Sequence, residues 1–346
     1  MASKAIIGLI LSLTLSISSW ADVIKLNPTH PTSYTVVKGD TLWDISAKFL
    51  QDPWQWPNIW HHNEQIKNPH LIYPGDVITL CFIDNQPRLC VNSPANDESI
   101  LYPHIHAEGI DQAIDMIPNE AIRPYLSSPK VVSKDELANA PYIIDFSGEH
   151  IIAAEGDQIY VRSILKPEYI AYTTYRPGDT YTDPESNEIL GYEAKYIADN
   201  VILELGDPAT LRITNTKKEV RHGDRLMPSS EEEVAFNFFP TPPTELIKGS
   251  IIAVLNGVQE IGQYDIIVIS KGRQDGLKQG HLLSIIQKGK IVTDPFHMNK
   301  NELVKLPDQD AGIALVFRIF DRVSYALVMS ASKNIRVLDR VQTPEK

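Results

Sequence analysis

Hydrophobic residues change their spacing along the chain, and this change separates a mixed segment from a long β-rich one. Between Tyr34 and Lys38, apolar and polar residues alternate, which predicts a short strand. After a Gly-Asp turn, Leu42, Ile45 and Phe49 recur at the spacing of one helix face. The mixed segment therefore begins with a strand that turns directly into an amphipathic helix.

The same segment continues with a second helix and a second strand. A Thr-x-x-Asp capping box beginning at Thr41 marks the start of the first helix. Pro57 suits the first turn of a second helix over residues 56–63. A Pro-Gly-Asp turn then leads into a strand over residues 77–80. The predicted order is strand, helix, helix, strand.

Beyond this segment the pattern becomes irregular and then strongly β-like. Residues 81–140 are Pro-containing and predict a linker with short helices. From residue 141, short β-branched runs alternate with Gly-Asp, Asp-Pro and Pro-Gly turns, which is typical of all-β structure. We therefore expect an α+β multidomain chain, in which a βααβ module is followed by a mixed linker and two related β-rich modules.

The evidence for two related modules is an internal repeat. The Thr-Asp-Pro turn at 182–184 recurs at 293–295, and residues 220–226 resemble 335–341 in the same order. We place the modules at 141–228 and 247–346, joined by an acidic, Pro-rich linker at 229–246. Additional turn signals at 271–280 predict an extra hairpin in the second module.

Composition narrows the function classes. The chain has 346 residues, of which 43% are hydrophobic and 22% charged, so it is globular in character. Its formal net charge of −12 gives no basic surface for nucleic acid or anionic lipid. No stretch reaches the roughly 20 apolar residues of a membrane span. We therefore expect no nucleic-acid partner and no membrane span.

The first 21 residues have the order of an export signal. A short positive start precedes an apolar run over residues 5–17, and small residues lead to a cleavage site after Ala21. We expect a mature chain that begins at Asp22 and resides in the periplasm; the alternative is a buried N-terminal helix. In that oxidising compartment, Cys81 and Cys90 are expected to form a disulfide. Two buried free thiols are the alternative.

Three stretches of the mixed segment read Y-x-V-x-x-G-D-T-L-x-x-I-S at 34–46, W-x-x-N at 60–63 and N-P-x-L-I-Y-P-G-D-x-I at 68–78. In this order and spacing they resemble the LysM domain, a small βααβ carbohydrate-binding module. The Pro- and Trp-rich stretch at 53–57 is longer than the minimal family pattern. The resemblance covers residues 34–80, about a seventh of the chain.

The resemblance implies binding of glycans that contain N-acetylglucosamine, such as peptidoglycan or chitin. It places two loops as the walls of a groove, with the residues Gly39, Asp40, Thr41 and Leu42 on one wall and Asn68, Pro69, Leu71 and Ile72 on the other. An N-acetyl group needs a backbone donor, a backbone acceptor and an apolar contact for its methyl group. Leu42 and Ile72 could supply the apolar contact. The alternative is that Gly39, Asp40 and Thr41 only form the turn and the helix cap.

Two tryptophans of the same segment allow two interpretations. Trp54 and Trp56 could stack on sugar rings, but a small module needs large buried side chains, so we expect them in its core.

Other chemistry is not supported by the sequence. The His104-x-His106 pair lacks a third zinc ligand, and His61 and His62 point to different sides of a helix. Neither cysteine lies in a nucleophile signature. We expect no metal site, no cofactor and no catalytic residue.

The sequence therefore predicts a non-catalytic periplasmic protein that binds peptidoglycan glycan strands through one LysM domain. The β modules are expected to contact another envelope protein. Two alternatives remain at this point: a cell-wall hydrolase targeted by its LysM domain, and an envelope scaffold or assembly factor that acts through the β modules.

Overall fold

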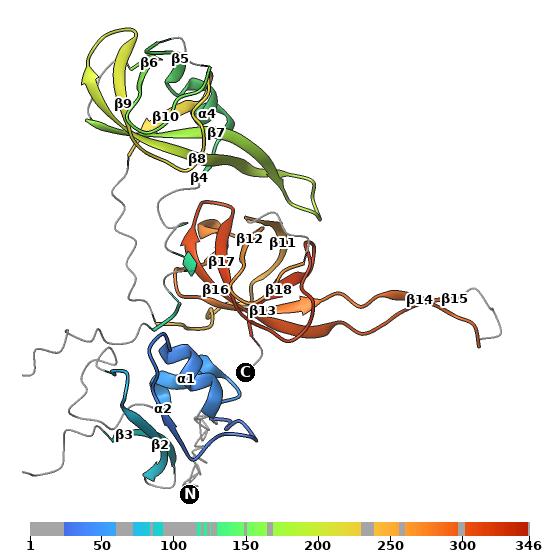
Figure 1. Ribbon diagram of the computed structural model, residues 1–346. Coiled ribbons are helices and arrows are strands. Elements are labelled where there is room, and N and C mark those ends of the chain that lie inside the picture. The colour runs from blue at the N-terminus through green and yellow to red at the C-terminus, as the bar shows by residue number, and fades with distance from the viewer. Residues whose placement is uncertain are drawn as a thin grey trace, which may run out of the picture. The chain divides into compact units, whose positions relative to one another are not determined.

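The computed structural model describes twelve ranges of the chain, and all structural statements concern these residues: 24–59, 72–83, 86–92, 116–118, 121–122, 125, 130–148, 151–164, 169–229, 239–255, 260–296 and 302–344. The chain divides into two compact units, residues 1–114 and 115–345 (Figure 1). The expected signal segment, residues 1–21, lies outside the described residues. None of the described helices is long and apolar enough to cross a membrane.

The first unit combines short helices with a three-stranded antiparallel sheet. The sheet has the order β1-β2-β3, and the elements are β1 (Ser33–Thr35), α1 (Leu42–Phe49), the 3-10 helix η1 (Pro53–Gln55), α2 (Trp56–Ile59), β2 (Val77–Ile83) and β3 (Gln86–Asn92). The predicted strand-to-helix start is confirmed. The second helix begins where it was expected, and its predicted end at residue 63 lies outside the described residues.

Local sequence explains the position of α1. The Thr41 hydroxyl accepts a hydrogen bond from the Asp44 N–H, and the Asp44 carboxylate accepts one from the Thr41 N–H, which completes the predicted capping box. The helix buries Leu42, Ile45 and Phe49. Because these three side chains pack inward, the loop that precedes the helix is held against the core of the unit.

Strand β3 extends the sheet beyond the predicted βααβ order. Cys81 in β2 and Cys90 in β3 form a disulfide with a Cα–Cα distance of 6.0 Å, which confirms the expected pairing. Arg88 of β3 donates a hydrogen bond to the carbonyl of Asn58 in α2. The β2–β3 hairpin is thus joined covalently within itself and by a hydrogen bond to the helical side of the unit.

The second unit begins with a ring of six antiparallel strands, preceded by β4 (Lys130–Val132) and α4 (Lys134–Asn139). The ring strands are β5 (Tyr142–Phe146), β6 (Gln158–Arg162), β7 (Ala171–Thr182), β8 (Ile189–Glu204), β9 (Ala209–Thr216) and β10 (Arg225–Pro228). They pair in the order β8-β7-β10-β5-β6-β9, and β9 pairs back to β8. We refer to this ring as barrel 1.

A closed barrel follows in the same unit, and we refer to it as barrel 2. Its strands are β11 (Lys248–Val254), β12 (Ile266–Ile269), β13 (Leu282–Gln287), β16 (Gln309–Ile319), β17 (Ser324–Ala331) and β18 (Arg340–Gln342). They pair in the order β11-β12-β17-β16-β13-β18. Counted from the first strand of each ring, both barrels follow the order first, second, fifth, fourth, third, sixth.

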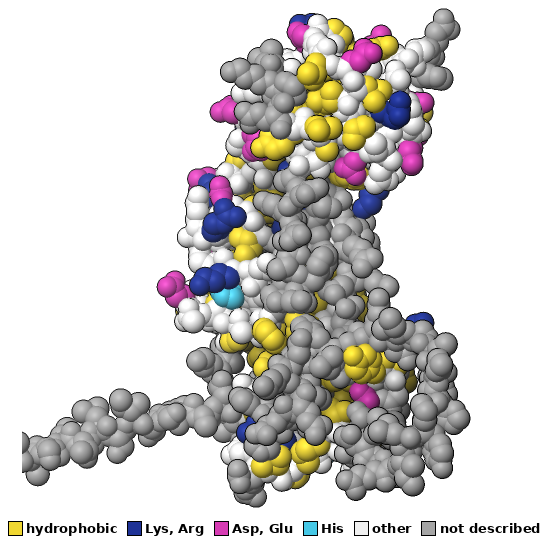
Figure 2. Space-filling view, turned by 90° about the vertical axis from the view of Figure 1, so that its left-hand side faces the viewer, with side chains coloured by type: hydrophobic (Ala, Val, Ile, Leu, Met, Phe, Trp, Pro, Cys, Tyr) yellow, Lys and Arg dark blue, Asp and Glu magenta, His cyan; other side chains and the backbone are white. Residues whose placement is uncertain are grey.

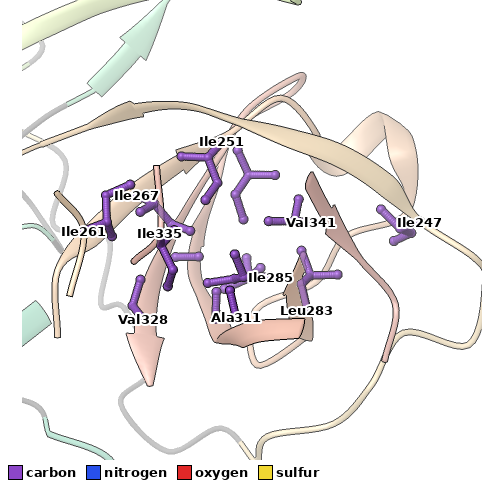
Figure 3. Packing of buried hydrophobic residues seen from close by; sticks show 14 of the residues in the cluster. Ile247, Ile251, Ile261, Ile267, Leu283, Ile285, Ala311, Val328, Ile335 and Val341 are labelled. Atoms are coloured by element: carbon purple, nitrogen blue, oxygen red, sulfur yellow. The ribbon is translucent and has the colours of Figure 1, made fainter. Parts of the chain in front are cut away.

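Each barrel is filled by aliphatic side chains that point inward from alternate positions of its strands. In barrel 2, Ile251, Ile267, Ile285, Ile335 and Val341 converge on the interior (Figure 3). Barrel 1 has a corresponding cluster that includes Ile143, Ile159, Leu211 and Leu226.

The extra hairpin of the second module is not at 271–280, and that prediction is wrong. Residues Arg273–Asp275 form a 3-10 helix, η3, and a left-handed Gly276 follows it. The extra hairpin instead consists of β14 (Ile291–Asp294) and β15 (Glu302–Lys305), which extend from barrel 2 as a separate two-stranded ribbon (Figure 1).

Candidate functional site

Two turns of the same type precede α1 and β2 in the first unit. In the turn 37–40, the Val37 N–H donates to the Asp40 carboxylate at 2.9 Å, and Gly39 has a φ of +97°. In the turn 73–76, the Tyr73 N–H donates to the Asp76 carboxylate at 3.0 Å. The third residue of that turn is a glycine with a φ of +102°. Only glycine adopts such angles without strain, which explains the Gly-Asp pairs.

Backbone hydrogen bonds hold the two turns side by side. The Val36 N–H donates to the Asp76 carbonyl at 2.9 Å, and the Gly75 N–H donates to the Val36 carbonyl at 2.8 Å. The loop before α1 and the loop before β2 are therefore neighbours. The sequence analysis expected these two loops to form the walls of a groove.

Tyr34 fixes the first turn from the side of the sheet. Its hydroxyl donates to the Asp40 carboxylate at 2.9 Å, and the Lys48 ammonium lies 4.6 Å from the centre of its ring. Burial raises the pKa of the Tyr34 hydroxyl, and the Asp40 carboxylate raises it further. Tyr34 is thus a positioning residue that the sequence analysis did not select. The sequence feature that could have identified Tyr34 is its place in the strand, six residues before the aspartate that closes the turn.

The residues predicted to form the first wall have different structural roles. Gly39 is exposed, and a Cβ atom at this position would meet nothing within 4 Å. Asp40 is half-buried and closes the turn. Thr41 is 5% exposed, and its hydroxyl donates to Asp44 at 2.7 Å, so its side chain is committed to the helix cap.

The expectation that Leu42 and Ile72 supply apolar contact to a sugar methyl group is wrong for their side chains. Leu42 is 1% exposed and Ile72 is fully buried, because both pack into the core of this small unit. Their contribution to a ligand is limited to the backbone. Asn68, Pro69 and Leu71, the rest of the second wall, lie outside the described residues.

The aromatic side chains near the turns divide between core and surface. Trp56 is 2% exposed and belongs to the core, as predicted. Trp54 is only half-buried, and Tyr73 of the second turn is 37% exposed. Tyr73 is therefore an accessible aromatic ring at the site, a role that the sequence analysis did not assign to it.

The described residues contain no group of three or more His, Cys, Asp or Glu side chains placed to hold a metal ion. The four histidines that the sequence analysis weighed as metal ligands, His61, His62, His104 and His106, lie outside the described residues.

Comparison with family models matches the LysM domain to residues 34–80, the segment that contains both turns. Residues 34–80 are a LysM domain. The chain is also similar to the Uncharacterized protein YqbP of Bacillus subtilis (strain 168), with 40% identity over 60 residues. That match covers 14% of this chain and 27% of the relative, so the chain spans about a quarter of the relative's length. The likeness is confined to a module and does not extend to the whole protein.

Proposed function

We propose that the protein binds N-acetylglucosamine-containing glycan strands of peptidoglycan through its LysM domain. The observation that carries the proposal is the match of residues 34–80 to the LysM domain, with its two turns fixed side by side. A loop that is already rigid in the free protein loses little entropy when a ligand binds. The buried Asp76, the capped helix and the Tyr34–Asp40 hydrogen bond all contribute to that rigidity.

The chemistry of the site favours recognition by backbone and by surface aromatics. An N-acetyl group offers one N–H donor and one carbonyl acceptor, which suit the backbone groups of a loop. The open space above Gly39 allows close approach. Since Leu42 and Ile72 are buried, we assign the apolar contact to the side chain of Leu71 or the ring of Tyr73.

The test is co-sedimentation of the purified protein with insoluble peptidoglycan sacculi. We expect the double variant Asn68→Ala/Leu71→Ala to pellet at least about tenfold less efficiently than wild type, because it loses one polar and one apolar contact. Phe82→Ala is the matched control, since Phe82 is exposed at the far end of β2. Equal pelleting of the double variant and wild type, with equal thermal stability, would show that the groove assignment is wrong.

We further propose that this binding is non-catalytic and takes place in the periplasm. The hydrolase alternative predicts that the protein releases soluble glycan fragments from purified sacculi, and detection of such fragments would contradict our proposal. The expected location predicts that the protein is recovered in the periplasmic fraction. Its first residue there should be Asp22.

We also infer that barrels 1 and 2 are copies of one β module, and three observations support this inference. The six strands pair in the same order. The Thr-Asp-Pro triplets at 182–184 and 293–295 both stand at the end of the outgoing strand of the hairpin between the third and fourth ring strands, β7 in barrel 1 and β14 in barrel 2. The stretches 220–226 and 335–341 both lead into the last strand of their ring.

A further inference from the structure

The β14–β15 ribbon of barrel 2 exposes a concentration of apolar side chains. These are Ile291, Val292, Phe296, Leu303, Val304 and Leu306, and Phe296 is 95% exposed. Val292 faces Val304 across the ribbon and Thr293 faces Leu303, so apolar residues occupy both of its faces. An isolated two-stranded hairpin is marginally stable in water, and an apolar surface of this extent marks an interaction site.

Polar contacts of Asp308 join the two strands of the ribbon at its base. The Gly289 N–H donates to the Asp308 carboxylate at 2.9 Å, and Lys305 forms an ion pair with the same carboxylate at 2.9 Å. A Cβ atom at Gly289 would lie 1.8 Å from the carbonyl oxygen of Leu306, so only glycine allows the two strands to approach here. These contacts fix the two strands of the ribbon to each other where they leave barrel 2.

Barrel 1 shows what such a hairpin does within the same unit. Its corresponding hairpin, between β7 and β8, contacts the β16–β17 loop of barrel 2. The Arg322 guanidinium of that loop makes two hydrogen bonds to the Glu188 carboxylate, at 2.7 and 2.8 Å. On the same hairpin, burial raises the pKa of the Tyr181 hydroxyl, and the neighbouring Tyr325 of β17 adds to this effect. The hairpin of one barrel thus rests on the loop between the fourth and fifth strands of the other.

The equivalent loop of barrel 1, residues 205–208 between β8 and β9, is exposed, and its Asp207 forms an ion pair with Arg162. Exposed apolar side chains gather beside that pair, and we name them the acceptor patch: Leu205 of the loop, Leu203 of β8, and Tyr169 and Ile170 just before β7. The Ile202 N–H donates to the Ile170 carbonyl at 3.0 Å, which holds these two segments together. The register shows the equivalence, because Glu204 pairs with Thr210 in barrel 1 as Arg318 pairs with Tyr325 in barrel 2. Leu203 therefore corresponds to Phe317, yet Phe317 is 1% exposed and Leu203 is 39% exposed. Hydrophobic side chains are visible on the surface of barrel 1, at the top of Figure 2.

We propose that the β14–β15 ribbon of one molecule docks on the acceptor patch of a second copy of the chain. Within the described residues of the two barrels, each barrel has one hairpin between its third and fourth ring strands and one loop between its fourth and fifth, and the internal contact uses the hairpin of barrel 1 and the loop of barrel 2. The β14–β15 ribbon of barrel 2 and the acceptor patch of barrel 1 are left over, and both expose apolar side chains. They correspond in position to the β7–β8 hairpin and the β16–β17 loop, which contact each other within the chain. Because donor and acceptor are different surfaces, the contact is head-to-tail and can continue from copy to copy.

The experiment measures the association state of the purified full chain by sedimentation velocity across a concentration series. We expect wild type to associate as its concentration rises. Leu303→Lys in the ribbon and Leu205→Lys in the acceptor patch should each weaken association at least about tenfold, because each places a charge in an apolar contact. Ile151→Lys is the matched control, since Ile151 is 84% exposed on the β5–β6 loop, at the opposite end of barrel 1.

A mixture of the two variants gives the decisive result. The Leu303→Lys protein keeps its patch and the Leu205→Lys protein keeps its ribbon, so together they should form one contact and stop at a dimer. Circular dichroism checks that each variant is folded. If Leu303→Lys does not fold, Leu303→Ser takes its place. A wild type that stays monomeric at all concentrations would overturn the proposal. So would loss of association in Leu303→Lys but not in Leu205→Lys, which would mean that the ribbon docks on a different surface of the second copy.

Discussion

One residue pattern recurs in all three folded modules: a turn closed by an aspartate. In each case the first residue's N–H donates to the carboxylate of an aspartate three residues later, at 2.8 to 3.0 Å. The aspartates are Asp40, Asp76, Asp157, Asp224, Asp265 and Asp339. The residue before the aspartate has a positive φ, and it is glycine in four turns but Tyr264 and Leu338 in the other two.

The sequence reveals these turns only where the glycine is present. The Gly-Asp pairs at 39–40, 75–76, 156–157 and 223–224 are visible as turn signals. Tyr264 and Leu338 give no such signal, because a left-handed conformation is unusual for large L-residues. The turns that contain Tyr264 and Leu338 could be inferred only by aligning the second β module with the first, residues 141–228.

Leu338 offers a direct test of this strain. A φ of +76° strains the folded backbone of an L-residue by roughly 1–2 kcal/mol. Glycine removes this strain, but it loses more conformational entropy on folding, which costs about 0.5–1 kcal/mol. Since Leu338 is 51% exposed, little packing is lost. We expect Leu338→Gly to stabilise barrel 2 by about 0.5–1 kcal/mol in urea unfolding. The converse change, Gly223→Ala, should destabilise barrel 1 by about 1 kcal/mol, and a destabilised Leu338→Gly protein would contradict the assignment.

At the level of elements, sequence reasoning succeeded where local signals were complete. The α1 helix carries both the apolar spacing and the capping box, and it begins at the predicted residue. Strand β3 was missed, because Pro87 and the polar residues around it gave the segment an irregular pattern. What makes it a strand is the neighbouring β2, with which it shares seven registered pairs.

The misplaced extra hairpin has a similar cause. The Asp275-Gly276 turn signal is real, but Asp275 accepts a hydrogen bond from the Gly272 N–H and so closes a short 3-10 helix. A Cβ atom at Gly272 would meet the carbonyl oxygen of Phe320 at 2.5 Å, so this segment packs tightly on the β16–β17 loop. Turn signals alone cannot distinguish a hairpin from a turn that is packed on a distant strand.

The disulfide hairpin gives a prediction at this scale. The chain-entropy model for a loop of this length expects the Cys81–Cys90 bond to contribute about 2–3 kcal/mol. The double variant Cys81→Ser/Cys90→Ser should lower the stability of the first unit by that amount in urea unfolding. Thiol titration of the denatured wild type should find no free thiol before reduction and two afterwards. Two reactive thiols before reduction would rule out the bond.

At the scale of the whole molecule, the sequence could not give the strand order of the barrels. Alternation and turns describe neighbouring residues, whereas β5 pairs with β10 and β6 pairs with β9 across long stretches of chain. The same limitation applies to Arg322 and Glu188, which lie 134 residues apart in sequence. Their contact depends on tertiary structure that no local pattern encodes.

This contact should depend on pH. Hydrogen bonding and the charge of Arg322 lower the pKa of the Glu188 carboxyl. Its stabilising effect is therefore complete above the ordinary glutamate pKa of about 4.3 and is lost as the pH falls through the lowered value. We expect Glu188→Gln to melt below wild type at pH 7, and the difference to shrink as the pH falls below the ordinary glutamate pKa and through the lowered one. Glu185→Gln, on the same turn, serves as the control. A Glu188→Gln difference that is absent at pH 7 or unchanged at low pH would contradict the contact.

Strand β18 has a consequence for how barrel 2 is made. It is three residues long, yet it pairs with β11 on one side and with β13 on the other. Gly249 pairs with Val341, which lies 92 residues further along the chain, so the barrel cannot close until nearly all of its chain has been synthesised. A translation product that stops before Arg340 would carry two open strand edges, and such edges recruit strands from other molecules. The loss of a few residues here should therefore cause aggregation of the whole chain rather than a local defect.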